Sequence, residues 1–219
     1  MSYILNIETS TKNCSVSIGL DGKTIALVEL AEAHFGHAEK LHLFVEQALE
    51  ASKITLNQLK AVAVSKGPGS YTGLRIGVSA AKGFAYSLNI PLISVDTLLV
   101  LAKKVNPEEN TFIIPMLDAR RMEVFTAVFD ENHTSVEKTH ALILSASAFE
   151  HYTQKIYCIG DCQDKAMQVL KHNNIQFVKE AVYPSAKEMS SLSYELFLKN
   201  EFEDTAYFEP FYLKDFFLG

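Results

Sequence analysis

The sequence predicts an α/β protein in which one βββαβαβα unit occurs twice. Short alternating apolar runs, typical of strands, are interleaved with longer runs whose apolar residues recur at helical spacing. The order of these runs starts again after the polar segment 106–110, Asn-Pro-Glu-Glu-Asn, which predicts a boundary between two halves, residues 1–106 and 107–219. The halves share the pattern of elements and not the residues themselves.

In the first half, strands are expected at 3–8, 14–20 and 23–31, and Asp21-Gly22 is a hairpin turn signal between the last two. An amphipathic helix is expected next, because apolar residues form one stripe along 37–52. The remaining elements alternate: a strand at 60–65, a helix rich in glycine and alanine at 71–88, a strand at 91–94 and a helix at 96–105.

In the second half, the same order is expected: strands at 111–117, 122–129 and 136–144, a helix at 147–153, a strand at 156–159, a helix at 163–173, a strand at 176–178 and a helix at 186–199. Ser185 and Glu188 form the capping-box pattern at the start of the last helix. The aromatic tail, 208–214, is expected to pack back onto the body. A duplicated βββαβαβα unit is the arrangement of the actin-like and sugar-kinase-like (ASKHA) fold, which binds nucleotide between its halves.

Composition and charge narrow the class of protein. The net charge is −6 without a strong basic run, whereas a chain that binds nucleic acid by itself more often carries a basic patch. The three cysteines include no Cys-x-x-Cys pair, which indicates a reducing cytosol and no disulfide framework. No apolar run approaches membrane-spanning length and no basic leader precedes the first strand, so a cytoplasmic protein without a membrane contact is expected.

The stretch 66–75, Lys-Gly-Pro-Gly-Ser-Tyr-Thr-Gly-Leu-Arg, turns a buried strand into a helix. A glycine-rich turn before a helix N-terminus can bind phosphate through free backbone amides. The P-loop and dinucleotide patterns both fail here, because Thr72 stands where each requires glycine. Two interpretations stay open: an architectural turn and an anion site.

Small residues recur every four positions in the helix that follows, at Gly73, Gly77, Ala81 and Ala85. They share one line of the helix and let another backbone approach closely. Glycine inside a helix costs about 0.5–1 kcal/mol relative to alanine, so a compensating contact is expected, inside the chain or across an interface.

Three strings of the sequence together carry a family resemblance: ILNIETSTKNCSVSI, KGPGSYTGLRIGVSAAKGFA and MLDARRMEVFTA. They closely resemble the bacterial TsaB family, also called YeaZ, of tRNA threonylcarbamoyladenosine synthesis. The match is strongest over residues 1–129, and it implies the ASKHA fold.

The resemblance implies a non-catalytic subunit that binds TsaD, the catalytic paralogue, as a heterodimer, and activates it for transfer of threonylcarbamoyl to adenosine next to the anticodon of tRNA. It also implies TsaE as a further partner, tRNA contact only through the complex, and a homodimer of the chain alone. No intrinsic cofactor is implied, and ATP or ADP with magnesium belongs to the complex. The expected partner-binding residues on helices 37–52 and 71–88 are Leu41, Phe44, Val45, Tyr71, Leu74, Arg75, Val78, Ser79, Lys82 and Tyr86.

Three turns lie at the positions of the nucleotide-binding turns of this fold, but each lacks a glycine that such turns usually contain. Glu8-Thr9-Ser10 lacks a glycine, Asp118-Ala119-Arg120 has arginine in place of glycine, and Gly160-Asp161-Cys162 has cysteine in place of a second glycine. Such turns need glycine because backbone amides approach phosphate closely. A degenerate nucleotide cleft is therefore expected at Glu8, Thr9, Ser10, Asp118, Arg120 and Gly160. An ordinary hairpin tip at residues 8–10 and an internal Asp118–Arg120 ion pair are the open alternatives.

No metal site and no catalytic residue are expected. His34, His37 and His42 cluster in the sequence, but no carboxylate completes a recognisable ligand set, and the segment 94–99 lacks the histidine pair of TsaD. The alternative function is a small ATP-dependent phosphotransferase, in which Glu8 or Asp118 would coordinate metal or act as a general base. A metallopeptidase ranks below it.

Overall fold

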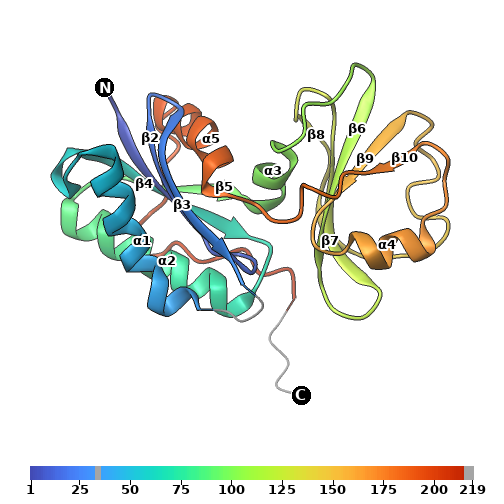
Figure 1. Cartoon of the computed structure of the whole chain (residues 1–219), viewed down its shortest axis with the longest axis horizontal. Coiled ribbons are helices and arrows are strands. Elements are labelled where there is room, and N and C mark those ends of the chain that lie inside the picture. The colour runs from blue at the N-terminus through green and yellow to red at the C-terminus, as the bar shows by residue number, and fades with distance from the viewer. Residues whose placement is uncertain (33–35, 215–219) are drawn as a thin grey trace.

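The computed structural model describes residues 1–32 and 36–214, which form two lobes, each built on a five-stranded mixed sheet (Figure 1). The first sheet has the order β3-β2-β1-β4-β5, and the second has the order β10-β9-β6-β7-β8. In each sheet the central strand, β1 or β6, pairs antiparallel with the strand that follows it, β2 or β7. On its other side it pairs parallel with the fourth strand of its half, β4 or β9. The repeated order confirms the predicted fold class, a duplicated α/β unit.

The strands of the first sheet are β1 (Tyr3–Glu8), β2 (Asn13–Leu20), β3 (Lys23–Ala31), β4 (Leu59–Gly67) and β5 (Leu92–Asp96). Helices α1 (His37–Ser52) and α2 (Tyr71–Leu88) cover one face, and their apolar stripes join β1, β2 and β4 in one core cluster. A 3-10 turn, η1 (Leu56–Gln58), precedes β4 and was not predicted. The opposite face of this sheet is covered by a helix from the other half of the chain.

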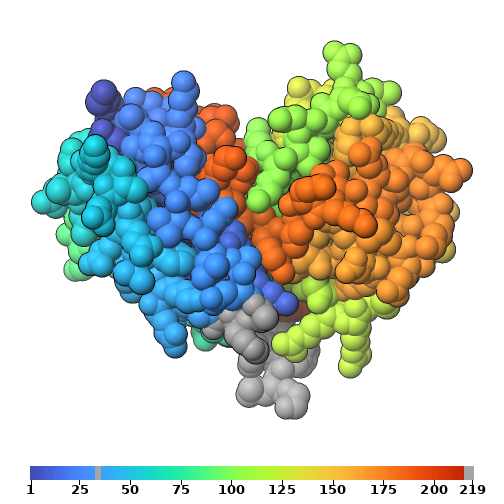
Figure 2. Space-filling view, in the orientation of Figure 1, coloured from blue at the N-terminus to red at the C-terminus, as the bar shows by residue number. Residues whose placement is uncertain are grey.

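That helix is α5 (Ala186–Leu198), and its packing on the first sheet shows that the lobes do not coincide with the halves of the sequence (Figure 1). Its apolar side packs on β1, β4 and β5, and the Ser193 hydroxyl donates to Asn6 Oδ1 at 2.6 Å. In return, α3 (Thr97–Ala102) inserts Leu98 and Leu101 into the core of the second lobe. Each half of the chain therefore lends a helix to the other, across the division at residues 106–107. The space-filling view shows the lobes in contact below and separated by a notch above (Figure 2).

The second lobe contains β6 (Thr111–Asp118), β7 (Glu123–Phe129), β8 (Ser135–Ile143), β9 (Lys155–Ile159), α4 (Gln163–Val169) and β10 (Ile175–Phe177). The prediction of a helix at 147–153 is wrong, because residues 146–151 form turns. Phe149 adopts a left-handed conformation, φ 66°, that buries its ring in the core and cannot continue a helix. Helices α3 and α4 are also shorter than predicted. Of the predicted capping box, only the Ser185 half forms, through the Lys187 amide.

The tail packs back onto the first lobe, as predicted. The Phe211 amide donates to the Lys66 carbonyl at 2.7 Å, and the Lys82 ammonium donates to the carbonyls of Ala206 and Phe208 at 3.0 Å each. The ring of Tyr212 lies 4.9 Å from that of Tyr71. The tail therefore occupies one side of α2. None of the helices in the described part of the chain has both the length and the apolar character needed to cross a membrane.

Candidate functional site

The turn between β1 and β2 lies under the glycine-rich turn that precedes α2. Glu8 is completely buried; its Oε1 accepts a hydrogen bond from the Ser10 amide at 2.6 Å, and its Oε2 has no partner. The hydroxyls of Ser10 and Ser65 are close to this carboxyl but make no hydrogen bond of good geometry with it. Burial raises the pKa of Glu8 to about 7, because the charged form loses its hydration. The carboxyl is thus enclosed in the protein.

Three backbone amides of the glycine-rich turn donate inside the chain. The Ser70 amide donates to the Ser10 carbonyl at 2.6 Å, the Gly67 amide donates to Thr97 Oγ1, and the Gly73 amide donates to Ser70 Oγ. A bound anion would have to displace these contacts, since it needs free amides. The geometry therefore favours the architectural interpretation of this turn over the anion site.

The small-residue stripe of α2 also makes its close contact inside the chain. A Cβ atom at Gly73 would lie 2.1 Å from the Thr9 carbonyl oxygen, and one at Gly77 would lie 2.2 Å from Thr9 Oγ1. The Thr9 hydroxyl donates in turn to the Gly73 carbonyl at 2.8 Å. Gly83, which lies off this stripe, has open space where a Cβ would stand. Of the two predicted kinds of contact, internal packing is the one that the stripe makes.

The turn between β6 and β7 differs from the predicted arrangement. Asp118 Oδ1 accepts hydrogen bonds from the Lys165 ammonium at 2.5 Å and from the Arg120 backbone amide at 3.0 Å. The Asp118–Arg120 ion pair, one of the two open interpretations of this turn, does not form, because the Lys165 ammonium takes the place of the guanidinium. Arg120 and Arg121 both have positive φ, 68° and 49°, which is the backbone conformation that glycine adopts most readily.

The loop after β9 is closely packed on β6. Gly160 has φ +117°, and a Cβ there would lie 1.9 Å from the Met116 carbonyl oxygen. The Cys162 thiol donates to the same carbonyl at 3.1 Å, and burial raises its pKa to about 12. The Asp118 amide donates to Asp161 Oδ1 at 2.9 Å and so joins this loop to the β6–β7 turn. The structure thus brings the Asp118, Arg120 and Gly160 turns together, and it separately joins residues 8–10 to the start of α2.

The partner-binding prediction needs correction. Five of its ten side chains belong to the core of the first lobe: Leu41, Phe44, Val45, Leu74 and Val78. The reason is that the apolar stripe of each helix faces the sheet. Of these five, only Leu41 also lines the groove described below. Lys82 holds the tail, and the Arg75 guanidinium lies 4.7 Å from the centre of the Tyr71 ring, which packs on Tyr212. Ser79 and Tyr86 remain exposed.

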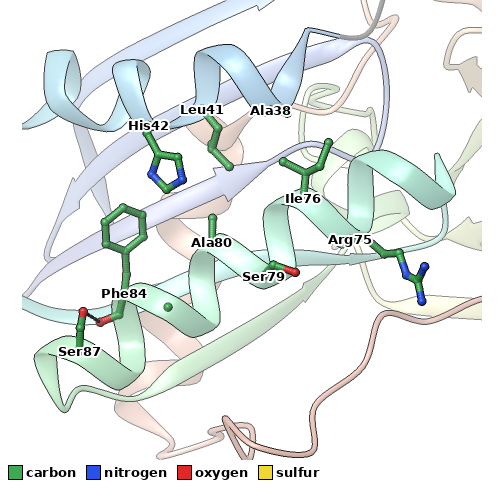
Figure 3. A pocket seen from close by; sticks show the side chains of 10 residues that line it. Ala38, Leu41, His42, Arg75, Ile76, Ser79, Ala80, Phe84 and Ser87 are labelled. Carbon is green, nitrogen blue, oxygen red and sulfur yellow. Dashed lines mark hydrogen bonds between the residues drawn. The ribbon is translucent and has the colours of Figure 1, made fainter.

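A groove that the sequence did not reveal runs between α1 and α2 (Figure 3). Its volume is about 650 Å³, and its lining consists of Ala38, Leu41 and His42 from α1 and Arg75, Ile76, Ser79, Ala80, Gly83, Phe84 and Ser87 from α2. The rings of His42 and Phe84 approach each other at one end, 5.7 Å between centres, whereas Arg75 points away at the other end. The signal in the sequence is a second helical line through residues 76, 80, 83 and 87, with Gly83 on it.

The histidines that were tested for a metal site are separated by the fold. His37 is buried and its Nε2 lies 2.7 Å from the Thr11 carbonyl oxygen, while His42 lines the groove. His34 lies outside the described residues. Across residues 1–32 and 36–214, no group of three or more histidine, cysteine or acidic side chains is arranged to hold a metal ion.

Comparison with known proteins decides the family. The model of the TsaD family, tRNA N6-adenosine threonylcarbamoyltransferase, matches residues 31–207. The TsaB protein of Buchnera aphidicola subsp. Schizaphis graminum (strain Sg) is 31% identical over 195 residues, which cover 85% of this chain and 90% of that protein. The chain belongs to the TsaB family. The resemblance found in the three sequence strings is thereby confirmed.

Other members and neighbours agree with this assignment. The TsaB protein of Escherichia coli (strain K12) is 28% identical over 220 residues, covering 97% of this chain and 94% of that protein. The solved structure of YeaZ from Pseudomonas aeruginosa matches with a TM-score of 0.85 at 23% identity, over 97% of this chain and all of that one. EutJ from Carboxydothermus hydrogenoformans matches with a TM-score of 0.55 at 10% identity, over 87% of this chain and 90% of that one. The solved structures show the ASKHA fold that the TsaB family shares.

Proposed function

We propose that this chain acts in the synthesis of threonylcarbamoyladenosine in tRNA, as a subunit without chemistry of its own that binds and activates a TsaD-type transferase. The Escherichia coli and Buchnera relatives are both named as tRNA threonylcarbamoyladenosine biosynthesis proteins. The match to the TsaD family model supports the partner, because two related chains can pair through the same self-complementary surface that a symmetric homodimer uses.

The observation that carries the partner proposal is the open groove between α1 and α2. Its floor is apolar, its edge at Gly83 is free of other atoms, and both flanking helices present small or aromatic side chains to it. A helix fits such a groove by packing its ridge between the two helices. The groove is therefore the proposed seat of a helix of the transferase, and of a second copy when the chain is alone.

The β1–β2 turn and the glycine-rich turn that packs on it support a subunit without chemistry. Glu8 is buried, and the amides of Gly67, Ser70 and Gly73 already have internal acceptors. A phosphotransferase, the alternative function, needs an accessible acid and free amides in these turns. ATP or ADP, magnesium and TsaE are proposed to join only in the complex.

The test of the groove is Gly83→Leu, which places a side chain in the open space without meeting another atom near its Cβ. We expect the affinity for the cognate TsaD, measured by titration calorimetry, to fall by about 1.4 kcal/mol or more, a factor of ten. The matched control is Ser191→Leu, on the exposed face of α5 across the sheet. Equal affinity of both variants would refute the groove as the binding surface.

A second measurement separates the two candidate functions. Glu8→Gln and Asp118→Asn proteins are combined with TsaD, tRNA and threonylcarbamoyl-adenylate, and modified tRNA is quantified. A subunit without chemistry keeps the rate of the unaltered chain in both variants. A loss of rate with unchanged TsaD affinity would favour the phosphotransferase and a working cleft.

A further inference from the structure

The β6–β7 turn carries an arrangement that the proposed function does not use. Two of the three arginines in the chain are adjacent here, at Arg120 and Arg121, and both have left-handed backbone conformations. Residues other than glycine, asparagine and aspartate seldom adopt this backbone conformation. Residues that do so are concentrated at functional sites. Tight hairpin turns commonly use positive φ, and Asp21 and His133 have it in the β2–β3 and β7–β8 hairpins. The unusual feature of the β6–β7 turn is that two adjacent arginines adopt it.

The surrounding contacts hold this turn rigidly. The Lys165 ammonium donates to Asp118 Oδ1 and to the carbonyls of Arg121 and Glu123, at 2.5, 3.0 and 2.7 Å. These three acceptors occupy all the donors of one ammonium group. The Glu123 amide also donates to the Arg120 carbonyl at 3.1 Å. The two arginines are therefore presented on a preformed backbone.

Within residues 1–32 and 36–214, neither guanidinium group has a partner, whereas the carboxylates of Asp118 and Glu123 are paired with lysines. Neither Arg120 nor Arg121 makes a side-chain hydrogen bond or ion pair with another described residue. Asp118 is paired with Lys165, and Glu123 is paired with Lys214. Both arginines are exposed. The turn that carries them joins β6 to β7 at one end of the second lobe (Figure 1). Among the described residues the positive charge of the two arginines has no partner, in a chain whose net charge is −6.

We infer that Arg120 and Arg121 form a phosphate-binding site for the RNA backbone, and that through it the chain contacts the tRNA substrate of the complex. Arginine presents a planar fork of donors that fits phosphate oxygens. A nucleotide cradle in this fold needs backbone amides instead, and here the Arg120 amide already donates to Asp118. Exposed arginine side chains can contact the phosphates of an extended RNA backbone. The polyphosphate of a nucleotide would need an enclosing set of free backbone amides, and the Arg120 amide of this turn is not free. The identity of the RNA rests on the proposed function; the phosphate site does not.

The test uses Arg120→Asn/Arg121→Gly, because both new residues tolerate positive φ and the hairpin keeps its fold. The control is Lys171→Gln/Lys179→Gln, which removes two exposed positive charges from the same lobe. Fluorescence anisotropy measures the binding of a labelled tRNA transcript to the complex with TsaD, and to the chain alone at low salt. We expect the arginine variant to bind about 10- to 100-fold more weakly and to lower the salt slope by about two, and the control to change affinity less than about threefold.

Three outcomes oppose the inference. Equal tRNA affinity of the arginine and control variants would overturn it. Loss of ATP–magnesium binding, measured by calorimetry, with tRNA binding intact would assign the site to a nucleotide. Full affinity in Arg120→Lys/Arg121→Lys would show that charge alone is enough and that the arginine fork is not used. The affinity of the chain for TsaD is measured separately. If the complex does not form, that result counts against the proposed function, and tRNA binding by the chain alone still tests the two arginines.

Discussion

The β1–β2 and β6–β7 turns occupy equivalent places in the two lobes and have opposite environments. Glu8 at the first turn is fully buried under the glycine-rich turn, whereas Asp118 at the second is exposed and paired with Lys165. The difference lies in what covers them. Residues 67–77 approach the first turn closely because Gly69, Gly73 and Gly77 have no side chain, whereas Arg120 and Arg121 stay exposed within the described part of the chain. One topology thus supports a closed turn in one lobe and an open one in the other.

The largest expected change in the free energy of unfolding comes from a substitution in residues 67–77, which cover the β1–β2 turn. Gly73→Ala places a Cβ 2.1 Å from the Thr9 carbonyl, and the displacement of β1 or α2 should cost about 3 kcal/mol of unfolding free energy. Urea unfolding measures it. Gly83→Ala on the same helix is the control and should gain about 0.5–1 kcal/mol, since its Cβ meets nothing and alanine favours helix. Similar stabilities for the two variants would contradict the close approach.

The next effect concerns the buried acid, and it depends on pH. Burial raises the pKa of Glu8 from 4.5 to about 7, so the folded state favours the protonated acid. The contribution of protonated Glu8 to the free energy of unfolding is fully present below pH 4.5 and is lost as the pH rises to about 7. The loss should reach about 3 kcal/mol at pH 8.

Comparison with Glu8→Gln isolates this contribution, because glutamine cannot ionise and still accepts the Ser10 hydrogen bond. The free energy of unfolding by urea, measured at pH 4.5 and pH 8, should fall less in the variant than in the unaltered chain. Asp118→Asn in the open turn is the control and should change this pH dependence much less. A parallel pH dependence of the Glu8→Gln and unaltered proteins would mean that the carboxyl is hydrated.

The smallest expected effect is on the open turn. Arg121→Gly relieves a left-handed backbone, φ 49°, and should raise the free energy of unfolding by up to about 1 kcal/mol. Thermal unfolding detects the gain as a higher Tm. Arg121→Ala at the same position is the control, and it should give no such gain, because alanine tolerates positive φ no better than arginine does. A destabilised Arg121→Gly protein would show that the arginine side chain supports the fold.

The sequence determined the elements that depend on local pattern. Alternation and helical spacing predicted the βββαβαβα order of the first half and all of the second half except its helix at 147–153, and the glycine-rich stretch 66–75 predicted the turn before α2. The three family strings were sufficient to identify the TsaB family, since long strings of specific residues are informative without any geometry. Phe149 shows the limit of local pattern, because its burial in a left-handed turn overrides the helical spacing of its neighbours.

Only the tertiary structure decided which faces are covered. The spacing of Leu41, Phe44 and Val45 showed that they share a face, but it could not show that this face meets the sheet and leaves the groove at Gly83 open. It likewise could not show that α5 covers the first sheet, that Lys82 holds the tail, or that Lys165 pairs with Asp118. The physical reason is that periodicity arises from contacts a few residues apart, whereas covering a face is settled by segments distant in the chain.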